Sequence, residues 1–333
     1  ETFKTNKVTN MTHMFSDCYS IRILDLSHLA TDNVIDMSYM FFHCESLIEL
    51  NLQNFETSKV QDMSHMFEEC IYLQTIENKF DTSEVTDMSF MFSDCSSLSK
   101  LDVSKFNTKK VRNMAYMFNF CRNLDKLETS NFDTAFVTNM SHLFYYLPQI
   151  DSFDTANFDT SNVEDMSFMF YGCGNVYEII LSNFKTSKVK YFTSMFEADS
   201  SLKSINVTHF DTSNAIDMSR MFKDCSSLNT LNLSNFKTEN VKSFSLTFSN
   251  CAKLLYLDLS NFETKNVEDM SYMFQFCTSM TSLNINFDTN KVTKMNSMFK
   301  NNKALRNFLF STFSNKKKKK KKIKKKEEEN IDK

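Results

Sequence analysis

The sequence contains very little glycine or proline and no tryptophan: Gly 2, Pro 1 and Trp 0 in 333 residues. Because interdomain linkers are usually rich in glycine, serine or proline, no stretch is predicted to be a linker. No apolar run approaches the length of about 18 residues that suggests a membrane span. The chain also has no C-x-x-C pair, no glycine-rich phosphate loop and no convergent Ser, His and Asp. We therefore predict no metal site, no bound cofactor and no enzymatic activity.

A unit of 26 residues is repeated twelve times, with two of the spacings shortened to 25. A Phe lies seven residues after the first residue of every unit, and a Thr lies three residues before it. Such a period is typical of solenoids, whose stacked units share one core, so the length does not imply several globular domains. We predict a repeat solenoid over residues 1–315. The twelve units begin at Val8, Val34, Val60, Val85, Val111, Val137, Val163, Val189, Ala215, Val241, Val267 and Val292.

The fourth unit illustrates the expected local structure. Apolar residues within 88–95 recur at i, i+3, i+4 and i+7, which predicts one face of a short helix. Asp87 precedes them and is a suitable N-cap. Residues 98–103 then follow the pattern L-x-x-L-x-V, whose last part alternates as in a strand. The predicted fold is an α/β solenoid, similar to a leucine-rich repeat, of about twelve coils. Each coil would have a short strand and a short helix, and the strands would form one continuous parallel sheet.

Methionine, cysteine and threonine each occupy fixed places in the unit. Twenty of the 21 Met lie three or six residues after its start, which favours core filling over an adaptable binding surface. All nine Cys lie ten residues after the start, where Leu147, Asp199 and Asn302 replace Cys in three units. These substitutions favour buried free thiols, although neighbouring coils could also bring successive Cys within disulfide range. The redox compartment therefore stays open. The Thr at the turn is expected to bond nearby backbone.

The consensus of the units is V-x-D-M-S-x-M-F-x-x-C-x-S-L-x-x-L-x-L-S-x-F-x-T-S. This consensus resembles the bacterial surface protein 26-residue repeat, a BspA-like branch of the leucine-rich repeats. The resemblance covers residues 1 to about 313. It implies a surface or secreted protein whose array serves adhesion or host interaction, and it offers no catalytic residues to transfer.

Charge is distributed unevenly between the repeats and the C-terminal tail. Residues 316–333 carry a net charge of +7, and the remaining residues carry −10. The acidic body disfavours nucleic-acid binding by the solenoid itself. The tail is low in complexity and predicted to be disordered. Three roles stay open for it: contact with anionic lipid or nucleic acid, a nuclear address, or a solvated end without a partner.

One column of polar residues lies between the last two apolar positions of each strand and is expected to face away from the core. It could bind a basic peptide, a sugar or a divalent cation. The favoured alternative is structural: these side chains accept hydrogen bonds from neighbouring backbone or resist edge aggregation. Six acids and four asparagines make up the column: Asp25, Asn51, Glu77, Asp102, Glu128, Asp154, Asn206, Asn232, Asp258 and Asn284.

The sequence thus predicts a non-enzymatic recognition or adhesion repeat protein at a cell surface or secreted, with an unidentified protein or carbohydrate ligand. The alternative is an intracellular leucine-rich-repeat scaffold whose basic tail contacts anionic membrane or nucleic acid. Because the chain opens in mid-unit at Glu1, we expect it to be a fragment of a longer array, so the lack of a visible signal peptide is uninformative.

Overall fold

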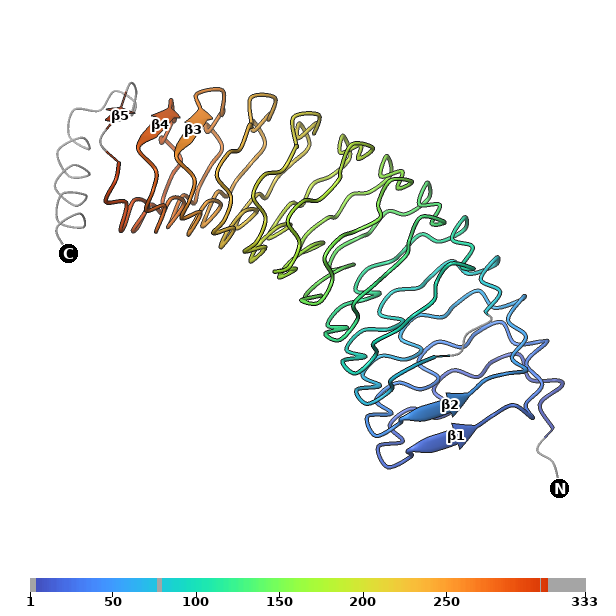
Figure 1. Ribbon diagram of the computed structural model, residues 1–333. Coiled ribbons are helices and arrows are strands. Elements are labelled where there is room, and N and C mark those ends of the chain that lie inside the picture. The colour runs from blue at the N-terminus through green and yellow to red at the C-terminus, as the bar shows by residue number, and fades with distance from the viewer. Residues whose placement is uncertain (1–3, 77–79, 306, 311–333) are drawn as a thin grey trace. The chain divides into compact units, whose positions relative to one another are not determined.

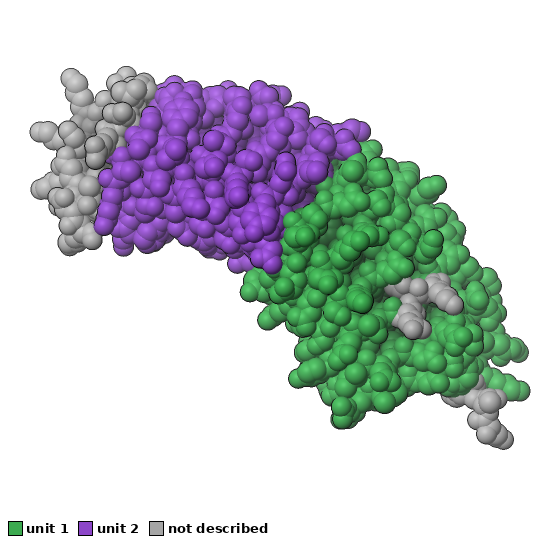
Figure 2. Space-filling view, in the orientation of Figure 1, with its two compact units in different colours: residues 1–163 green, residues 164–333 purple. Residues whose placement is uncertain are grey.

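The computed structural model describes residues 4–76 and 80–305, together with the backbone of residues 307–310 (Figure 1). The chain divides into two compact units, Glu1–Val163 and Glu164–Lys333 (Figure 2). Each unit is a stack of coils, one per sequence repeat (Figure 1). We number the coils 1 to 12 from Val8. The first residue of each coil is position 0, so that Val85 is position 0 and Phe90 is position 5 of coil 4. The predicted tail, 316–333, lies outside the described residues.

Five short strands are present in the described residues. In the first unit, β1 (Ile23–Asp25) pairs in parallel with β2 (Glu49–Asn51). In the second unit, β3 (Tyr256–Leu259), β4 (Ser282–Ile285) and β5 (Asn307–Phe310) form a parallel sheet in that order. The register places each residue opposite its repeat equivalent in the next coil, as with Tyr256 opposite Ser282.

The single continuous sheet that the sequence predicted is therefore replaced by two short sheets. In several intervening coils the equivalent segment keeps only one backbone bond to the preceding coil, such as Asn229 N–H to Lys203 O at 3.2 Å. A parallel ladder requires evenly spaced bonds along both strands, and one bond per coil does not provide this.

The predicted helix is not found: positions 4 to 9 of each described coil form a run of turns. Positions 5 and 9 are left-handed in all twelve coils, as with Phe90 (φ 58°) and Asp94 (φ 52°) in coil 4. A right-handed helix cannot include a residue in this conformation, so the interpretation of the apolar spacing as helical was wrong. Among the described residues there is no helix that could cross a membrane.

Backbone hydrogen bonds join these turns from coil to coil, and we call the resulting arrangement the turn ladder. In coil 4 the N–H groups at positions 3, 5, 7 and 9 donate to carbonyls of coil 5. The distances are 3.1 Å from Met88 to Asn113, 2.9 Å from Phe90 to Ala115, 3.0 Å from Phe92 to Met117 and 2.7 Å from Asp94 to Asn119.

The remaining turn amides bond within the coil, as with Met91 N–H to Met88 O at 3.3 Å. Alternate amides therefore point to the same neighbouring coil. A left-handed non-glycine residue costs about 1–2 kcal/mol, and the inter-coil bonds offset this at about 1 kcal/mol each.

Side chains from the turn ladder fill the core. In coil 4, Met88, Met91, Phe92 and Cys95 are fully buried, and the equivalents in coils 2 to 5 repeat this. The Phe rings at position 7 stack along each unit, with 5.7 Å between the ring centroids of Phe67 and Phe92. The core-filling interpretation of Met is thus confirmed for these coils.

The cysteines are free thiols, as predicted, and all but the partly exposed Cys18 are buried. In seven of them the S–H group donates to the carbonyl of the position-7 Phe one coil earlier, as from Cys95 Sγ to Phe67 O at 3.1 Å. Burial raises the pKa of the Cys44 thiol to about 12. Since the thiolate is the reactive form, a thiol of this kind is structural rather than nucleophilic.

The repeated Thr also joins neighbouring coils. Thr82 Oγ1 donates to Asn107 O at 3.0 Å and accepts from Asn107 N–H at 2.7 Å. Thr82 is buried, so its hydroxyl satisfies a backbone corner from which water is excluded. The predicted bond between this hydroxyl and the backbone is confirmed, and its partner lies in the next coil.

Candidate functional site

The exposed surface opposite the turn ladder is formed by positions 14, 15 and 17 of each coil, and we call it the strand face. In coil 8 these positions are Lys203, Ser204 and Asn206, which are all exposed. The residues on either side of Asn206, Ile205 and Val207, are buried. The alternation follows from the extended backbone, whose successive side chains point to opposite sides.

The polar column predicted to face away from the core lies on this face at position 17. Where the side chain is Asp or Asn, its Oδ1 atom commonly accepts the N–H group two residues later. The bond measures 2.9 Å from Ser104 to Asp102 and 3.0 Å from Ser27 to Asp25. The same bond is made by Asn51, Asn206, Asn232 and Asp258.

These bonds give the column a structural role. Hydrogen bonds from the Ser104 side chain and backbone hold the pKa of Asp102 below its ordinary value. Of the other members, Glu128 pairs with Lys126 at 2.6 Å and Asn284 lies in β4. Asp154 is exposed, and Glu77 lies outside the described residues. A ligand-binding role for the column remains a prediction.

The strand face of the first unit is highly charged in coils 4 to 6. Like charges on neighbouring strands repel one another, and opposite charges form exposed pairs that add little to stability. This part of the surface is a solvated polar face. Its charged members are Lys100, Asp102, Asp125, Lys126, Glu128, Asp151 and Asp154.

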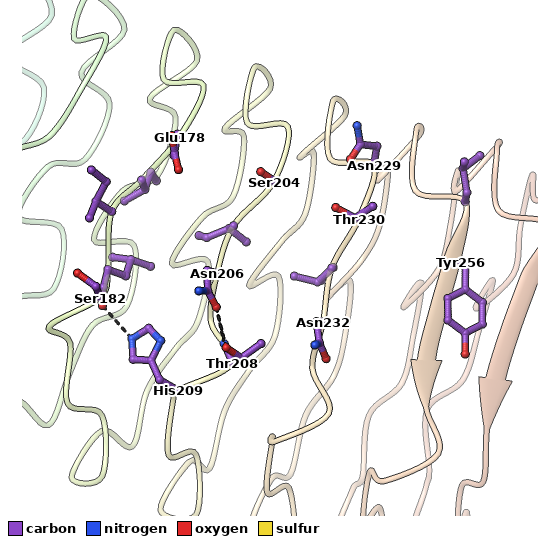
Figure 3. Close-up of a pocket in the computed structure, with 16 residues that line it drawn as sticks. Glu178, Ser182, Ser204, Asn206, Thr208, His209, Asn229, Thr230, Asn232 and Tyr256 are labelled. Atoms are coloured by element: carbon purple, nitrogen blue, oxygen red, sulfur yellow. Dashed lines mark hydrogen bonds between the residues drawn. The ribbon is translucent and has the colours of Figure 1, made fainter.

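In the second unit the strand face carries a hollow of about 720 Å³ over coils 7 to 10, which we call the groove (Figure 3). Among the residues that line it, Glu178 is the one acid, and no Lys or Arg is present. The groove thus differs from the face of coils 4 to 6 in its near lack of charge. It is lined by Glu178, Ile179, Ile180, Leu181, Ser182, Ser204, Ile205, Asn206, Thr208, His209, Asn229, Thr230, Leu231, Asn232, Leu255 and Tyr256.

The floor of the groove presents amides in fixed orientations. Asn206 Oδ1 accepts from the Thr208 N–H at 3.2 Å and from its hydroxyl at 2.7 Å. Asn232 Oδ1 accepts from the Ser234 N–H at 3.0 Å. Figure 3 shows both asparagines on neighbouring coils within the groove. Because each Oδ1 atom is held by backbone, each Nδ2 group remains a donor for a ligand.

Apolar and aromatic side chains border this floor. Ile180 at one end is 57% exposed, and Leu255 and Tyr256 at the other end are 54% and 51% exposed. The Tyr256 hydroxyl donates to Asp258 Oδ2 at 3.1 Å, which orients the ring. Since monomeric proteins usually bury large apolar side chains, neighbouring exposed ones often mark binding sites.

The lining offers hydrogen bonding and apolar contact rather than catalysis. His209 is the one imidazole in it, and its Nε2 atom lies 2.8 Å from Leu181 O. Among the described residues no group of three or more His, Cys, Asp or Glu is placed to hold a metal ion. This arrangement can bind a ligand reversibly by side-chain donors and acceptors.

The groove was not predicted from the sequence. Asn206 and Asn232 had been identified as members of the polar column, but Tyr256 and Leu255 were not predicted to be binding residues. The signal that could have identified them is the loss of charge at positions 14 and 15 in coils 9 and 10.

A second missed feature is a ladder of stacked rings at position 5 of the first unit. The rings of Tyr39 and His65 have centroids 4.2 Å apart, and those of His65 and Phe90 are 4.5 Å apart. The stack continues from Phe90 through Tyr116 to His142. Each internal ring is covered on both faces by its neighbours, so this ladder supports the turns rather than binding a ligand.

A family described as "Mycoplasma protein of unknown function, DUF285" matches residues 1–100, 71–152, 148–255 and 198–313. A leucine-rich cell surface protein from Faecalibacterium prausnitzii A2-165 aligns over 94% of this chain and 85% of its own, with 17% identity and a TM-score of 0.52. A leucine-rich repeat protein from Bacteroides ovatus ATCC 8483 aligns over 88% and 81%, with 17% identity and a TM-score of 0.43. No curated protein matches the sequence. The family match confirms the resemblance to the BspA-like repeats, and the likeness to the Faecalibacterium structure confirms the repeat-solenoid fold.

Proposed function

The chain belongs to the family described as Mycoplasma protein of unknown function, DUF285, and we propose that this member is a non-enzymatic recognition protein displayed at a cell surface. In this proposal it binds its ligand through the groove on the strand face of coils 7 to 10. The observation that carries the proposal is the groove itself: a hollow of about 720 Å³ with exposed apolar borders and a floor of polar donors.

Two further features support recognition rather than catalysis. Eight of the nine cysteines are buried, and burial raises the pKa of a thiol such as Cys44, which makes it a poor nucleophile. Apart from Glu178 and His209, the polar side chains of the groove carry amides and hydroxyls, which serve specificity through hydrogen bonds. The location is supported by the likeness in fold to the Faecalibacterium protein that is described as a cell surface protein.

Surface display is tested by treating intact cells that carry the protein with a protease and detecting the chain by immunoblot. We expect the chain to be cleaved, while a cytoplasmic marker protein stays intact. Protection of the chain until the cells are lysed would contradict surface display and favour the intracellular scaffold.

Recognition through the groove is tested with beads that carry the full chain and are incubated with a monolayer of epithelial cells. Thr230→Arg places a long charged side chain in the groove, whereas Thr278→Arg changes an exposed residue outside it. We expect wild-type and Thr278→Arg beads to adhere and Thr230→Arg beads to lose most of their adhesion. Equal adhesion of all three kinds of bead, or adhesion of none, would overturn the proposal.

A further inference from the structure

The near absence of charge in the groove restricts the chemistry of its ligand. Outside the tail the chain has a net charge of −10, yet the lining of the groove contains Glu178 as its one acid, His209 as its one imidazole and no Lys or Arg. An anionic ligand would find no Lys or Arg among the lining residues, since the Nζ atom of neighbouring Lys203 lies over the Tyr177 ring, 5.4 Å from its centroid. A basic peptide would find one carboxylate in the lining for several charges. Because specific interfaces place complementary charges opposite one another, an uncharged ligand fits this surface.

The polar groups of the floor suit a ligand rich in hydroxyl groups. The Oδ1 atoms of Asn206 and Asn232 are held by backbone N–H groups, which leaves their Nδ2 groups as donors for a ligand. Ser204 and Thr230 lie beside them with hydroxyls that both donate and accept. Amides and hydroxyls repeated on neighbouring coils can bond a chain whose own hydroxyls recur along its length.

The borders of the groove suit the apolar faces of such a ligand. Tyr256 presents a half-exposed ring whose hydroxyl is tied to Asp258, and Leu255 and Ile180 present aliphatic surface. A tyrosine ring offers a rigid apolar plane at a small entropic cost. The two borders are three coils apart, or roughly 14 Å at the spacing of parallel strands, which matches a short oligomer rather than a single small molecule.

We propose that the groove binds an uncharged carbohydrate chain lying along the stack of coils 7 to 10, with its hydroxyls on Asn206 and Asn232 and a C–H face against Tyr256. This inference rests on the proposed recognition function. A peptide added as an extra strand is disfavoured, since such binding uses the free edge of a sheet and the groove lies on a face.

The test is a titration of the full chain, followed by the methyl NMR signals of Ile180 and Leu255. Four neutral linear hexasaccharides, built from glucose, N-acetylglucosamine, mannose and galactose, are each added to millimolar concentration. A hyaluronan fragment and an oligolysine peptide serve as anionic and cationic comparisons. We expect at least one neutral sugar to shift both signals in a saturable manner, and neither charged probe to do so.

The matched variants replace amide donors with acceptors while keeping the Oδ1 bond to the backbone. Asn206→Asp with Asn232→Asp should weaken binding at least tenfold. Asn51→Asp changes an asparagine with the same backbone bond, at 3.1 Å to Gln53, on the strand face of the first unit. It should leave binding unchanged. Thr230→Val provides a second groove variant that carries no added charge, and it should weaken binding as well.

The carbohydrate inference is overturned if no neutral sugar shifts either signal, or if the asparagine and threonine variants bind as the wild type does. Its failure is distinguishable from that of the proposed function. If beads carrying wild-type protein adhere and Thr230→Arg beads do not, while no sugar binds, then the groove recognises another class of ligand. If adhesion is also insensitive to Thr230→Arg, both proposals fail.

Discussion

Asp199 occupies the position that Cys holds in most coils, and its side chain is fully buried. Its Oδ1 atom accepts the Cys173 N–H at 2.8 Å, while its Oδ2 atom has no hydrogen-bond partner among the described residues. Burial raises the pKa of this carboxyl well above its ordinary value, and the bond from Cys173 opposes the rise only in part. The nearby acid Glu197 is already paired with Lys223 at 2.7 Å. Asp199 therefore holds its proton to a higher pH in the folded chain than in the unfolded chain.

This burial makes stability depend on pH with a defined sign. An unfolded Asp ionises at about pH 4, whereas the folded form holds its proton to higher pH, so the stability of the wild type should fall as pH rises toward neutrality. Asp199→Cys restores the repeat residue and removes the unsatisfied oxygen. We expect it to raise the free energy of unfolding at neutral pH by about 1–3 kcal/mol, measured by urea titration.

Leu147→Cys is the matched control, because it restores Cys at the same position of coil 6 without removing an ionisable group. Its effect should be below about 1.5 kcal/mol and independent of pH. If the difference in stability between wild type and Asp199→Cys is the same near pH 4 as at neutral pH, the carboxyl is not the buried, protonated group described above.

The residues that could be predicted from the sequence are those whose type reveals their surroundings. The apolar residues were predicted to be buried and the repeated Thr to bond the backbone, because each of these residue types recurs at one position of the coils. Phe90 and Asp94 gave no comparable signal. Left-handed turns usually carry glycine, and here 23 of the 24 left-handed positions hold other residues. The backbone conformation was therefore not visible from residue type.

The turn ladder also explains why the expected helix was wrong. Residues at i, i+3, i+4 and i+7 share one face of a helix, but the same positions turn inward in this run of turns, whose left-handed residues lie four apart at positions 5 and 9. Asp87 was predicted to be the N-cap of this helix; it does accept a backbone bond, from the Ser89 N–H at 2.8 Å, but the segment that follows is a run of turns. A side-chain cap can begin a run of turns as readily as a helix, and apolar spacing cannot separate the two.

The strain of the turn ladder can be measured at Ala198, which is left-handed at φ 66°. Ala198→Gly removes only a methyl group, so its effect reports the conformation. We expect the variant to be more stable by about 0.5–1 kcal/mol, because relief of the left-handed strain exceeds the added flexibility of the unfolded chain.

Ala252→Gly supplies the comparison, since Ala252 is similarly half-buried and lies outside the left-handed positions. It should lower stability by about 0.5–1 kcal/mol in the same thermal or urea titration. Equal losses in the two variants would show that Ala198 is not strained.

At the scale of the whole molecule, the repeats are uniform inside and varied outside. The same core positions are occupied throughout, whereas the strand face is charged in coils 4 to 6 and nearly uncharged in the groove of coils 7 to 10. The sequence predicted the repeat solenoid because the core repeats. It could not predict the groove, because a hollow depends on how side chains from four coils lie together rather than on any one column.

Each assignment of a side chain to the core, the turn ladder or the strand face depends on coils built from turns without a helix. The most direct test is a set of backbone NMR chemical shifts for residues 85–95 in the deuterated full chain. We expect Phe90 and Asp94 to show the shifts of left-handed residues, and Phe92 between them to lack such shifts. Uniform helical shifts from Met88 to Cys95 would contradict the account.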